Sequence, residues 1–335
     1  MGQMQSRAHS RRGVWMAGEL RRAVQTVTGP IPVESLGRTL MHEHLLVGAP
    51  GWEFDDASAG LSFRDMVERC VDRIEELKSA GYRSLVDPCP RDMGRDVELM
   101  REVASRTGFN IICATGFYHS EIGAVSHWKF RMRLDPDAPK RLAETLVREL
   151  TEGVGTSGVR PGIVKTATGR AVTPYDLMML RAAACASLET NTPITTHTEG
   201  IHGDTQLETL CAVGVDPRAV IIGHTCGSND RVYQRSLLQR GAYVGFDRFG
   251  YAAANTDENR VSALVSMVRS GYGERIVVSH DCVLCYRGVD HLIPTERSFM
   301  RFERQIVPML RERGLSPGEI DRLTIDNPRA YFAGA

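Results

Sequence analysis

The sequence has no excess of charge of either sign. Its 41 Lys and Arg residues are matched by 41 Asp and Glu residues over 335 positions, so the formal net charge at pH 7 is zero. A balanced chain produces no overall field that would attract nucleic acid or an anionic membrane surface. We therefore expect neither kind of partner.

Long apolar runs are also missing. No stretch approaches the ~18 consecutive apolar residues of a membrane span, and the N-terminus has no apolar core of the kind a secretory signal needs. We therefore expect a cytoplasmic protein. The first residues, MGQMQSRAHSRRGVWMAGELRR, are rich in arginine and contain their first acidic residue only at Glu19. This composition predicts a flexible basic arm over residues 1–22 and a single domain over residues 23–335.

The cysteines do not form a recognisable framework. Eight are scattered through the chain, and the one CxxC pair, Cys282 and Cys285, has no second pair with which to build a structural zinc site. We expect reduced thiols in the core or in a pocket wall. A metal or redox role for Cys282 and Cys285 stays open.

Short apolar runs recur from residue 38 onward, separated by stretches long enough to be helices. Helical spacing runs through 62–80, 174–189, 259–270 and 299–313, and Thr173-Pro174 is a helix-start signal. The eight apolar runs are RTLMHEHLLV, YRSLVDPCP, NIICATGFY, PGIVKTAT, PITTHTE, VIIGHTC, AYVGFDRF and RIVVSHDC. Alternating strands and helices of this number predict an α/β fold, a single (β/α)₈ TIM barrel.

Within these runs the apolar part comes first and a polar or titratable residue comes last. The residues at or near the ends are His42, His44, Asp87, Tyr118, Lys165, His197, His224, Asp247, Arg248 and Asp281. Barrel active sites lie at the C-terminal ends of the strands, so we expect these side chains to converge there. An open doubly wound sheet is the competing fold, but such sheets begin with a glycine-rich turn, whereas the first strand here ends in HEH.

The histidines indicate a metal site. His42 and His44 flank Glu43 in a predicted strand, where alternation directs the two imidazoles to one side and Glu43 to the other. An HxH pair alone is weak evidence, because histidines in the core or on the surface are common. Four histidines and one aspartate at strand ends would, however, be an unusual core, since each needs a buried partner.

Lys165 lies in GIVKTAT, and its ammonium would point into the barrel mouth. One interpretation is a salt bridge to Asp281 or Asp87. The other is a lysine with a depressed pKa whose neutral amine reacts with CO₂ to form a carbamate, an anion with two oxygens that can bridge two cations. Both interpretations remain open at this stage.

The set of motifs resembles the phosphotriesterase-like lactonase family of the amidohydrolase superfamily. The likeness runs from about Val24 to Phe332 and includes VQTVTGPIPVESLGRTLMHEHL, GIVKTATG, TTHT, IIGHTCGSND, VGFDRFGY, SHDC and NPRAYF. It implies two divalent metal ions, zinc first and manganese, cobalt or iron as alternatives, bridged by carbamylated Lys165 and a hydroxide. His42, His44 and Asp281 would hold the more buried ion, and His197 and His224 the more exposed one.

The resemblance also implies a reaction. Asp281 would take a proton from the hydroxide, Tyr118 would orient the lactone ring or its leaving oxygen, and Arg248 would position loops and substrate. We expect a hydrolase of lactones, such as N-acyl-homoserine lactones or related γ/δ-lactones, that acts in quorum quenching, has a weak phosphotriesterase activity and forms a homodimer. An organophosphate triesterase, an N-acyl amide hydrolase and a non-catalytic ligand-binding member remain alternatives. Plain alternatives are a wall aromatic for Tyr118 and a buried ion pair for Arg248, and we expect His202, His280 and His291 to lie outside the ligand set.

Overall fold

The computed structural model describes residues 21–54, 60–123, 126–290 and 298–334. Residues 1–20 of the expected arm lie outside the described residues, as does His291. Arg21, near the end of that expected arm, donates from Nε to the carbonyl of Phe332 at 2.7 Å and so contacts the last helix of the domain.

Eight parallel strands form one sheet, in which neighbours in space follow the order of the chain. The strands are β3 (Arg38–Leu40), β5 (Tyr82–Asp87), β6 (Asn110–Gly116), β7 (Ile163–Ala167), β8 (Ile194–His197), β9 (Val220–Ile222), β10 (Tyr243–Phe246) and β11 (Ile276–Val278). Backbone hydrogen bonds join the first strand to the last: Met41 N donates to Val278 O at 3.3 Å, and Asp281 N donates to His42 O at 3.0 Å. The sheet closes into the predicted (β/α)₈ barrel, and all eight predicted strands are present.

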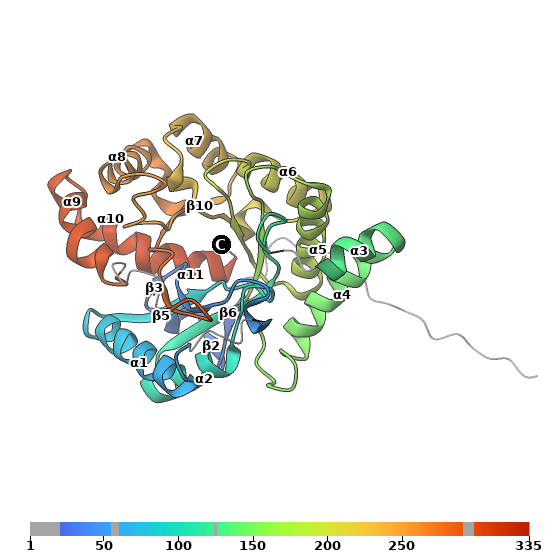
Figure 1. Cartoon of the computed structure of the whole chain (residues 1–335). Helices are drawn as coiled ribbons and strands as arrows, with labels where there is room; N and C mark the ends of the chain where they lie inside the picture. Colours follow the sequence, from blue (N-terminus) through green and yellow to red (C-terminus); the bar gives the residue numbers. More distant parts are fainter. Residues whose placement is uncertain (1–20, 55–59, 124–125, 291–297, 335) are drawn as a thin grey trace, which may run out of the picture.

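Helices form a ring around the strands (Figure 1). They are α1 (Phe63–Ser79), α2 (Val97–Thr107), α3 (Ser126–Leu134), α4 (Ala138–Thr151), α5 (Pro174–Thr190), α6 (Gly203–Val213), α7 (Arg231–Gln239), α8 (Asp257–Met267), α9 (Val307–Glu312), α10 (Pro317–Asp321) and α11 (Asn327–Ala333). The predicted start of α5 is confirmed: the Thr173 side chain accepts from Asp176 N, and Pro174 occupies the first turn, where no amide hydrogen is needed.

Alternation along the strands produces two separate apolar surfaces. Ile112, Ile163, Ile221 and Tyr243 belong to a buried cluster inside the barrel. Their neighbours in sequence, such as Val164, pack instead against the surrounding helices. Because successive side chains of a strand point to opposite faces, a residue two positions after an interior residue also points into the barrel. This rule decides which polar residues can reach the site.

The end of the chain closes the barrel opposite the strand ends. Tyr331 of α11 belongs to the interior cluster, and its hydroxyl donates to the carbonyl of Ile194, the first residue of β8, at 2.6 Å. An antiparallel hairpin of β1 (Ala23–Thr26) and β2 (Gly29–Pro32) contributes Val24 to the same cluster. The part of the interior cluster formed by Tyr331 and Val24 therefore lies at the N-terminal ends of the strands. The C-terminal ends are left for polar side chains.

Candidate metal centre

Strand alternation brings Lys165 and His197 into the barrel. Lys165 follows the interior residue Ile163 by two positions in β7, and His197 lies in the same phase in β8, opposite Ala167 in the parallel register. Both are almost fully buried, at 2% and 3% exposure. Local sequence pattern therefore suffices to place these two side chains.

The HEH segment differs from the prediction. It does not lie in one strand: β3 ends at Leu40, and β4 (His44–Val47) begins at His44. Glu43 N still donates to Val86 O of β5, and the chain leaves the barrel sheet at the next residue, where His44 N donates to Cys282 O and starts the parallel pairing of β4 with β12 (Val283–Tyr286). The predicted separation of side chains nevertheless holds: both imidazoles contact Asp281, whereas Glu43 contacts His280.

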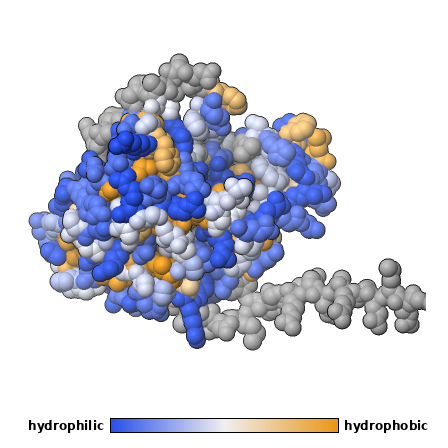
Figure 2. Space-filling model, turned by 90° about the horizontal axis from the view of Figure 1, so that it is seen from below, coloured by the Kyte–Doolittle hydropathy of each residue, from blue (hydrophilic) through white to orange (hydrophobic). Residues whose placement is uncertain are grey.

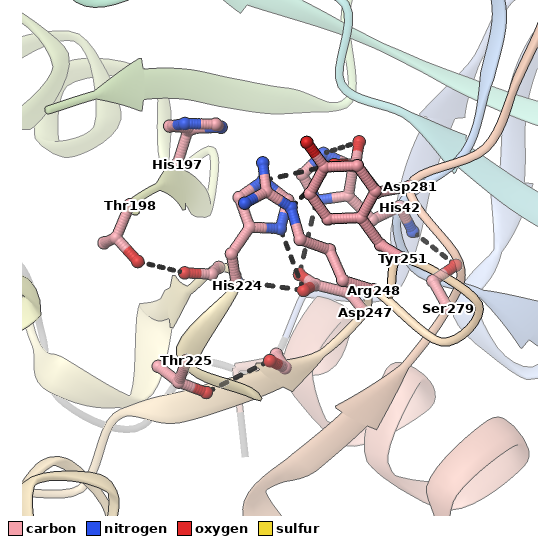
Figure 3. Close-up of polar contacts among 12 residues, drawn as sticks. His42, His197, Thr198, His224, Thr225, Asp247, Arg248, Tyr251, Ser279 and Asp281 are labelled. Carbon is pink, nitrogen blue, oxygen red and sulfur yellow. Dashed lines mark hydrogen bonds and ion pairs between the residues drawn. The ribbon is translucent and has the colours of Figure 1, made fainter. Parts of the chain in front are cut away.

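His42, His44 and Asp281 form one half of the centre. Asp281 Oδ1 lies 3.6 Å from His42 Nε2 and 3.4 Å from His44 Nε2. Asp281 and His42 come from opposite ends of the barrel sequence and meet because the sheet closes between β3 and β11 (Figure 3). The arrangement places two imidazole nitrogens and a carboxylate around one point, a donor set typical of divalent transition metals.

His224 and His197 lie on the other side of His42. The ring centroids of His42 and His224 are 4.6 Å apart, and so are those of His224 and His197. His224 Nε2 lies 3.8 Å from Asp281 Oδ2, so Asp281 faces both groups of histidines. The structure thus gathers the four predicted histidines and the predicted aspartate at one place.

Buried carboxylates contact the Nδ1 atoms of His42, His44 and His224. Asp247 Oδ1 accepts from the backbone N of His224 at 2.9 Å and lies 3.0 Å from His224 Nδ1, while its other oxygen lies 3.4 Å from His42 Nδ1 (Figure 3). Asp87 Oδ1 lies 3.3 Å from His44 Nδ1. A carboxylate on one ring nitrogen fixes the ring and leaves the other nitrogen available to a cation.

Lys165 lies among these ligands. Its Nζ is 3.4 Å from His42 Nε2 and 3.4 Å from the carbonyl of Thr196. Burial lowers the pKa of Lys165 to about 8, although Asp281 and Asp247 act in the opposite direction. A lysine in this environment has a neutral, nucleophilic amine available near neutral pH.

Tyr118 and Arg248 lie at the mouth of the centre. The Tyr118 hydroxyl is 3.3 Å from His197 Nε2, and Arg248 Nε donates to Asp281 Oδ2 at 2.9 Å. Arg248 also pairs with Glu199 at 3.7 Å, so the buried ion pair of the plain alternative is present, with Asp281 and Glu199 as its acids. A cavity of about 190 Å³ opens beside these groups, with apolar walls that include Val47, Pro90, Met93 and Val283.

Burial also sets the charge of the histidines. It lowers the pKa of His42 and His197 well below the usual value and lowers the pKa of His224, so these rings are neutral and carry a free lone pair at pH 7. His44 differs: burial acts downward, but hydrogen bonds with Asp281 and Asp87 raise its pKa well above the usual value. Burial alone would raise the pKa of Asp281, but the Arg248 guanidinium and the hydrogen bond with His44 hold it well below its usual range.

The remaining predicted residues lie where expected. Cys282 and Cys285 are buried in the apolar cluster that also holds Leu45, so they are core thiols. His202 contacts the carbonyl of Arg170 in a loop outside the ligand set, and His280 is buried behind Asp281.

The sequence model of the Phosphotriesterase family matches residues 22–332 of the chain. The chain belongs to the phosphotriesterase family. A phosphotriesterase homology protein from Mycobacterium tuberculosis is 30% identical over 321 residues, covering 92% of this chain and 97% of the relative. An organophosphorus hydrolase structure from Deinococcus radiodurans is 36% identical, with a TM-score of 0.90 and coverage of 93% and 97%. A mutant of a PTE-like lactonase from the same organism is 34% identical, with a TM-score of 0.87 and coverage of 92% of this chain and 99% of that chain.

Membership in the phosphotriesterase family makes the chain a metal-dependent hydrolase. The side chains fit such a metal. His224 Nε2 is buried, has no hydrogen-bond partner within the described residues, and lies next to Asp281. A buried imidazole nitrogen without a partner is costly unless an unseen group binds it, and a cation would satisfy it.

Two contacts of this phosphotriesterase-family site were not predicted. Glu199 Oε1 lies 3.0 Å from His197 Nε2, and His119 stacks on His197 with ring centroids 5.3 Å apart. His119, His197 and Glu199 form another group of possible metal-binding atoms, beside those that include His42 and His44. Glu199 follows His197 by two residues, so an acid at the next inward-facing position was the signal available in the sequence.

Proposed function

We propose that the chain opens lactones, N-acyl-homoserine lactones or related γ/δ-lactones, at a centre of two divalent metal ions. One observation carries the proposal. The Tyr118 hydroxyl beside His197 and the Arg248–Asp281 pair line the same cavity as the apolar side chains of Val47, Pro90, Met93 and Val283. Such a pocket can hold an apolar acyl substituent against its walls while polar groups meet the ring.

In this proposal His42, His44 and Asp281 would hold the more buried ion, and His197 and His224 would hold the more exposed one. Lys165, as a carbamate, would supply an anionic ligand to the centre. Zinc is the first expectation, and manganese, cobalt or iron fit the same nitrogen and oxygen donors. When bound, two such ions polarise a carbonyl oxygen and lower the pKa of a water molecule.

The side chains of the chain perform the remaining steps. Asp281, kept ionised by Arg248 and the hydrogen bond with His44, accepts the proton of the attacking water. Arg248 holds the Asp281 carboxylate through the Nε contact, so it orients the proton acceptor. Tyr118 remains protonated at neutral pH because burial raises its pKa, and its hydroxyl can therefore donate to the ring oxygen of the leaving group.

Organophosphate hydrolysis is the second candidate, since the chain resembles the organophosphorus hydrolase structure as well as the lactonase mutant. The same centre would also polarise the carbonyl of an N-acyl amide. These substrates differ in shape around the reacting atom, because a phosphotriester is tetrahedral before attack and a lactone or amide carbonyl is planar.

The test is a panel of substrates at one metal concentration. A pH-indicator assay would compare kcat/KM for N-acyl-homoserine lactones of several chain lengths, simple γ- and δ-lactones, paraoxon and N-acyl amino acids. We expect the highest values for a lactone and measurable but lower values for paraoxon. A highest value for paraoxon or for an amide would replace the lactonase proposal with the corresponding alternative.

A further inference from the structure

Glu43 is a buried acid that contacts neither the cavity nor a lysine or arginine in the described part of the chain. It is 0% exposed, lies between His42 and His44 in the segment that joins β3 to β4, and does not line the cavity. A buried carboxylate is costly unless it accepts several hydrogen bonds. The donors to Glu43 therefore indicate what it holds.

These donors come from the residues on both sides of Asp281. Glu43 Oε1 accepts from the backbone N of His280 at 2.8 Å, and Oε2 accepts from the backbone N of Cys282 at 3.1 Å. Asp281 itself has a positive φ of 53°, an uncommon conformation for a residue other than glycine. Such a backbone persists where surrounding contacts fix it, and Glu43 fixes it from both neighbours.

The contacts extend to His42 and to the helical segment that begins at Phe302. Ser279 Oγ donates to Glu43 Oε1 at 2.8 Å and accepts from the backbone N of His42 at 2.9 Å. His280 Nδ1 lies 2.6 Å from Glu43 Oε1, while His280 Nε2 accepts from the backbone N of Phe302 at 2.9 Å. Because Nε2 is an acceptor, Nδ1 carries the hydrogen that His280 donates to Glu43.

We propose that Glu43 and His280 form a positioning pair that holds Asp281 opposite His42 and His44 and so sets the affinity of that half of the centre for its metal ion. The inference rests on the proposed metal centre. Neither residue lines the cavity, so both act through Asp281 and His42 and not by contact with substrate. The other half depends on Asp247 and Glu199, which contact His224 and His197; Asp247 also lies 3.4 Å from His42 Nδ1, but neither acid belongs to the pair.

Glu43→Gln tests the pair with little change of volume. The amide replaces one acceptor oxygen with a donor, so it cannot accept all of the hydrogen bonds around Asp281. We expect two ions per chain in the wild type. In the variant, one ion should leave at a chelator concentration about 10- to 100-fold lower, while the other is retained. Elemental analysis after dialysis against graded dipicolinate measures the stoichiometry, and the visible spectrum of the cobalt-loaded protein reports the geometry that remains.

Glu149→Gln is the matched control. Glu149 is another buried acid, which accepts from Arg95 at 2.8 Å and from Thr115 at 2.6 Å, and none of these three residues lines the cavity. This variant should lose stability but retain both ions at the chelator concentrations of the wild type. Equal loss of metal from both variants would reduce the effect of Glu43 to general destabilisation and overturn the inference.

The remaining outcomes separate the inference from the proposed function. If the wild type holds two ions and Glu43→Gln holds both as tightly, the positioning role is wrong and the metal centre stands. If the wild type binds no stoichiometric metal, both proposals fail. Should Glu43→Gln not fold, Ser279→Ala removes the link between Glu43 and His42 more mildly, and we then expect a smaller loss confined to one ion; unchanged affinity there would contradict the inference.

Discussion

Lys165 is the residue at which the two interpretations of the centre diverge. Asp87 is not its salt-bridge partner in the described structure, because the Asp87 oxygens contact His44 Nδ1 and the backbone N of Leu45 and Cys89. The Asp281 and Asp247 carboxylates still act on Lys165 electrostatically. A carbamate and a buried ammonium therefore need an experiment that tells the two species apart.

Replacing Lys165 by Ala supplies that experiment. A carbamate ligand predicts that Lys165→Ala lowers lactone turnover by about 100-fold or more, because two cations lose the anion they share. Added propionate should restore part of the rate by occupying the vacated volume with a carboxylate. Lys165→Met is the control, since it removes the charge but fills the space, so propionate should not rescue it. Full metal content and a near-normal rate in Lys165→Ala without propionate would refute the carbamate.

Tyr118 offers a second test at this scale. Its hydroxyl lies 3.3 Å from His197 Nε2, at the mouth of the cavity. We expect Tyr118→Phe to lower kcat/KM for lactones by roughly 3- to 10-fold, the value of one hydrogen bond. Paraoxon hydrolysis should fall less, because its leaving group does not need this hydroxyl. An equal loss on both substrates would leave Tyr118 as a wall aromatic.

Among the elements, α11 fixes the barrel at the end opposite the centre. Asn327, its first residue, is 2% exposed, and its side-chain amide donates to Gly273 O at 2.8 Å and to Ile276 O at 2.6 Å. Ile276 begins β11, the strand that leads to Asp281. The helix therefore holds the start of the same strand whose far end carries the proposed proton acceptor.

Asn327→Ala should destabilise the fold without changing the chemistry. Two buried carbonyls lose their donors, which costs about 2 to 4 kcal/mol and lowers Tm by roughly 5 °C or more. Arg329→Ala on the same helix is the control: Arg329 makes an exposed pair with Asp326, and its loss should change stability by about 0.5 kcal/mol or less. Thermal unfolding and kcat measured on both variants check this. A large loss of kcat in folded Asn327→Ala would instead couple α11 to the centre.

For the whole molecule, metal binding should be linked to stability. The proposed ligands come from β3, β7, β8, β9 and β11 or from the residues that follow them, so one cluster joins most of the barrel. An ion that binds only the folded state at about 100 times its dissociation constant adds about 2.7 kcal/mol. We expect chelation to abolish activity, lower Tm and be reversed by added zinc, as elemental analysis and calorimetry would show. Active protein without stoichiometric metal would contradict the whole assignment.

The surface is consistent with the balanced composition. The face in Figure 2 is mostly hydrophilic, with apolar residues in small separate areas. No helix among the described residues is long and apolar enough to cross a membrane. The homodimer and the cytoplasmic location remain predictions, and sedimentation velocity would measure the first.

The sequence by itself determined the barrel and most of the members of the site. Strand alternation is a local property, and residues two positions apart point to the same face. Because Ile163 and Thr195 point into the barrel, Lys165 and His197 do so too. The site residues converge because they lie at or just after the C-terminal ends of the strands, and all parallel strands of a closed barrel end at the same face. These inferences need only a few neighbouring residues at a time.

Tertiary structure alone decided how those residues are held. The break between β3 and β4, the positive φ of Asp281 and the choice of ring nitrogen at each histidine depend on partners distant in sequence, such as Glu43 and His280, which are 237 residues apart. Asp247 contacts both His42 and His224, and no local pattern indicates that sharing. Hydrogen bonds act over about 3 Å, so only closure of the sheet, which brings β3 beside β11, could determine these contacts.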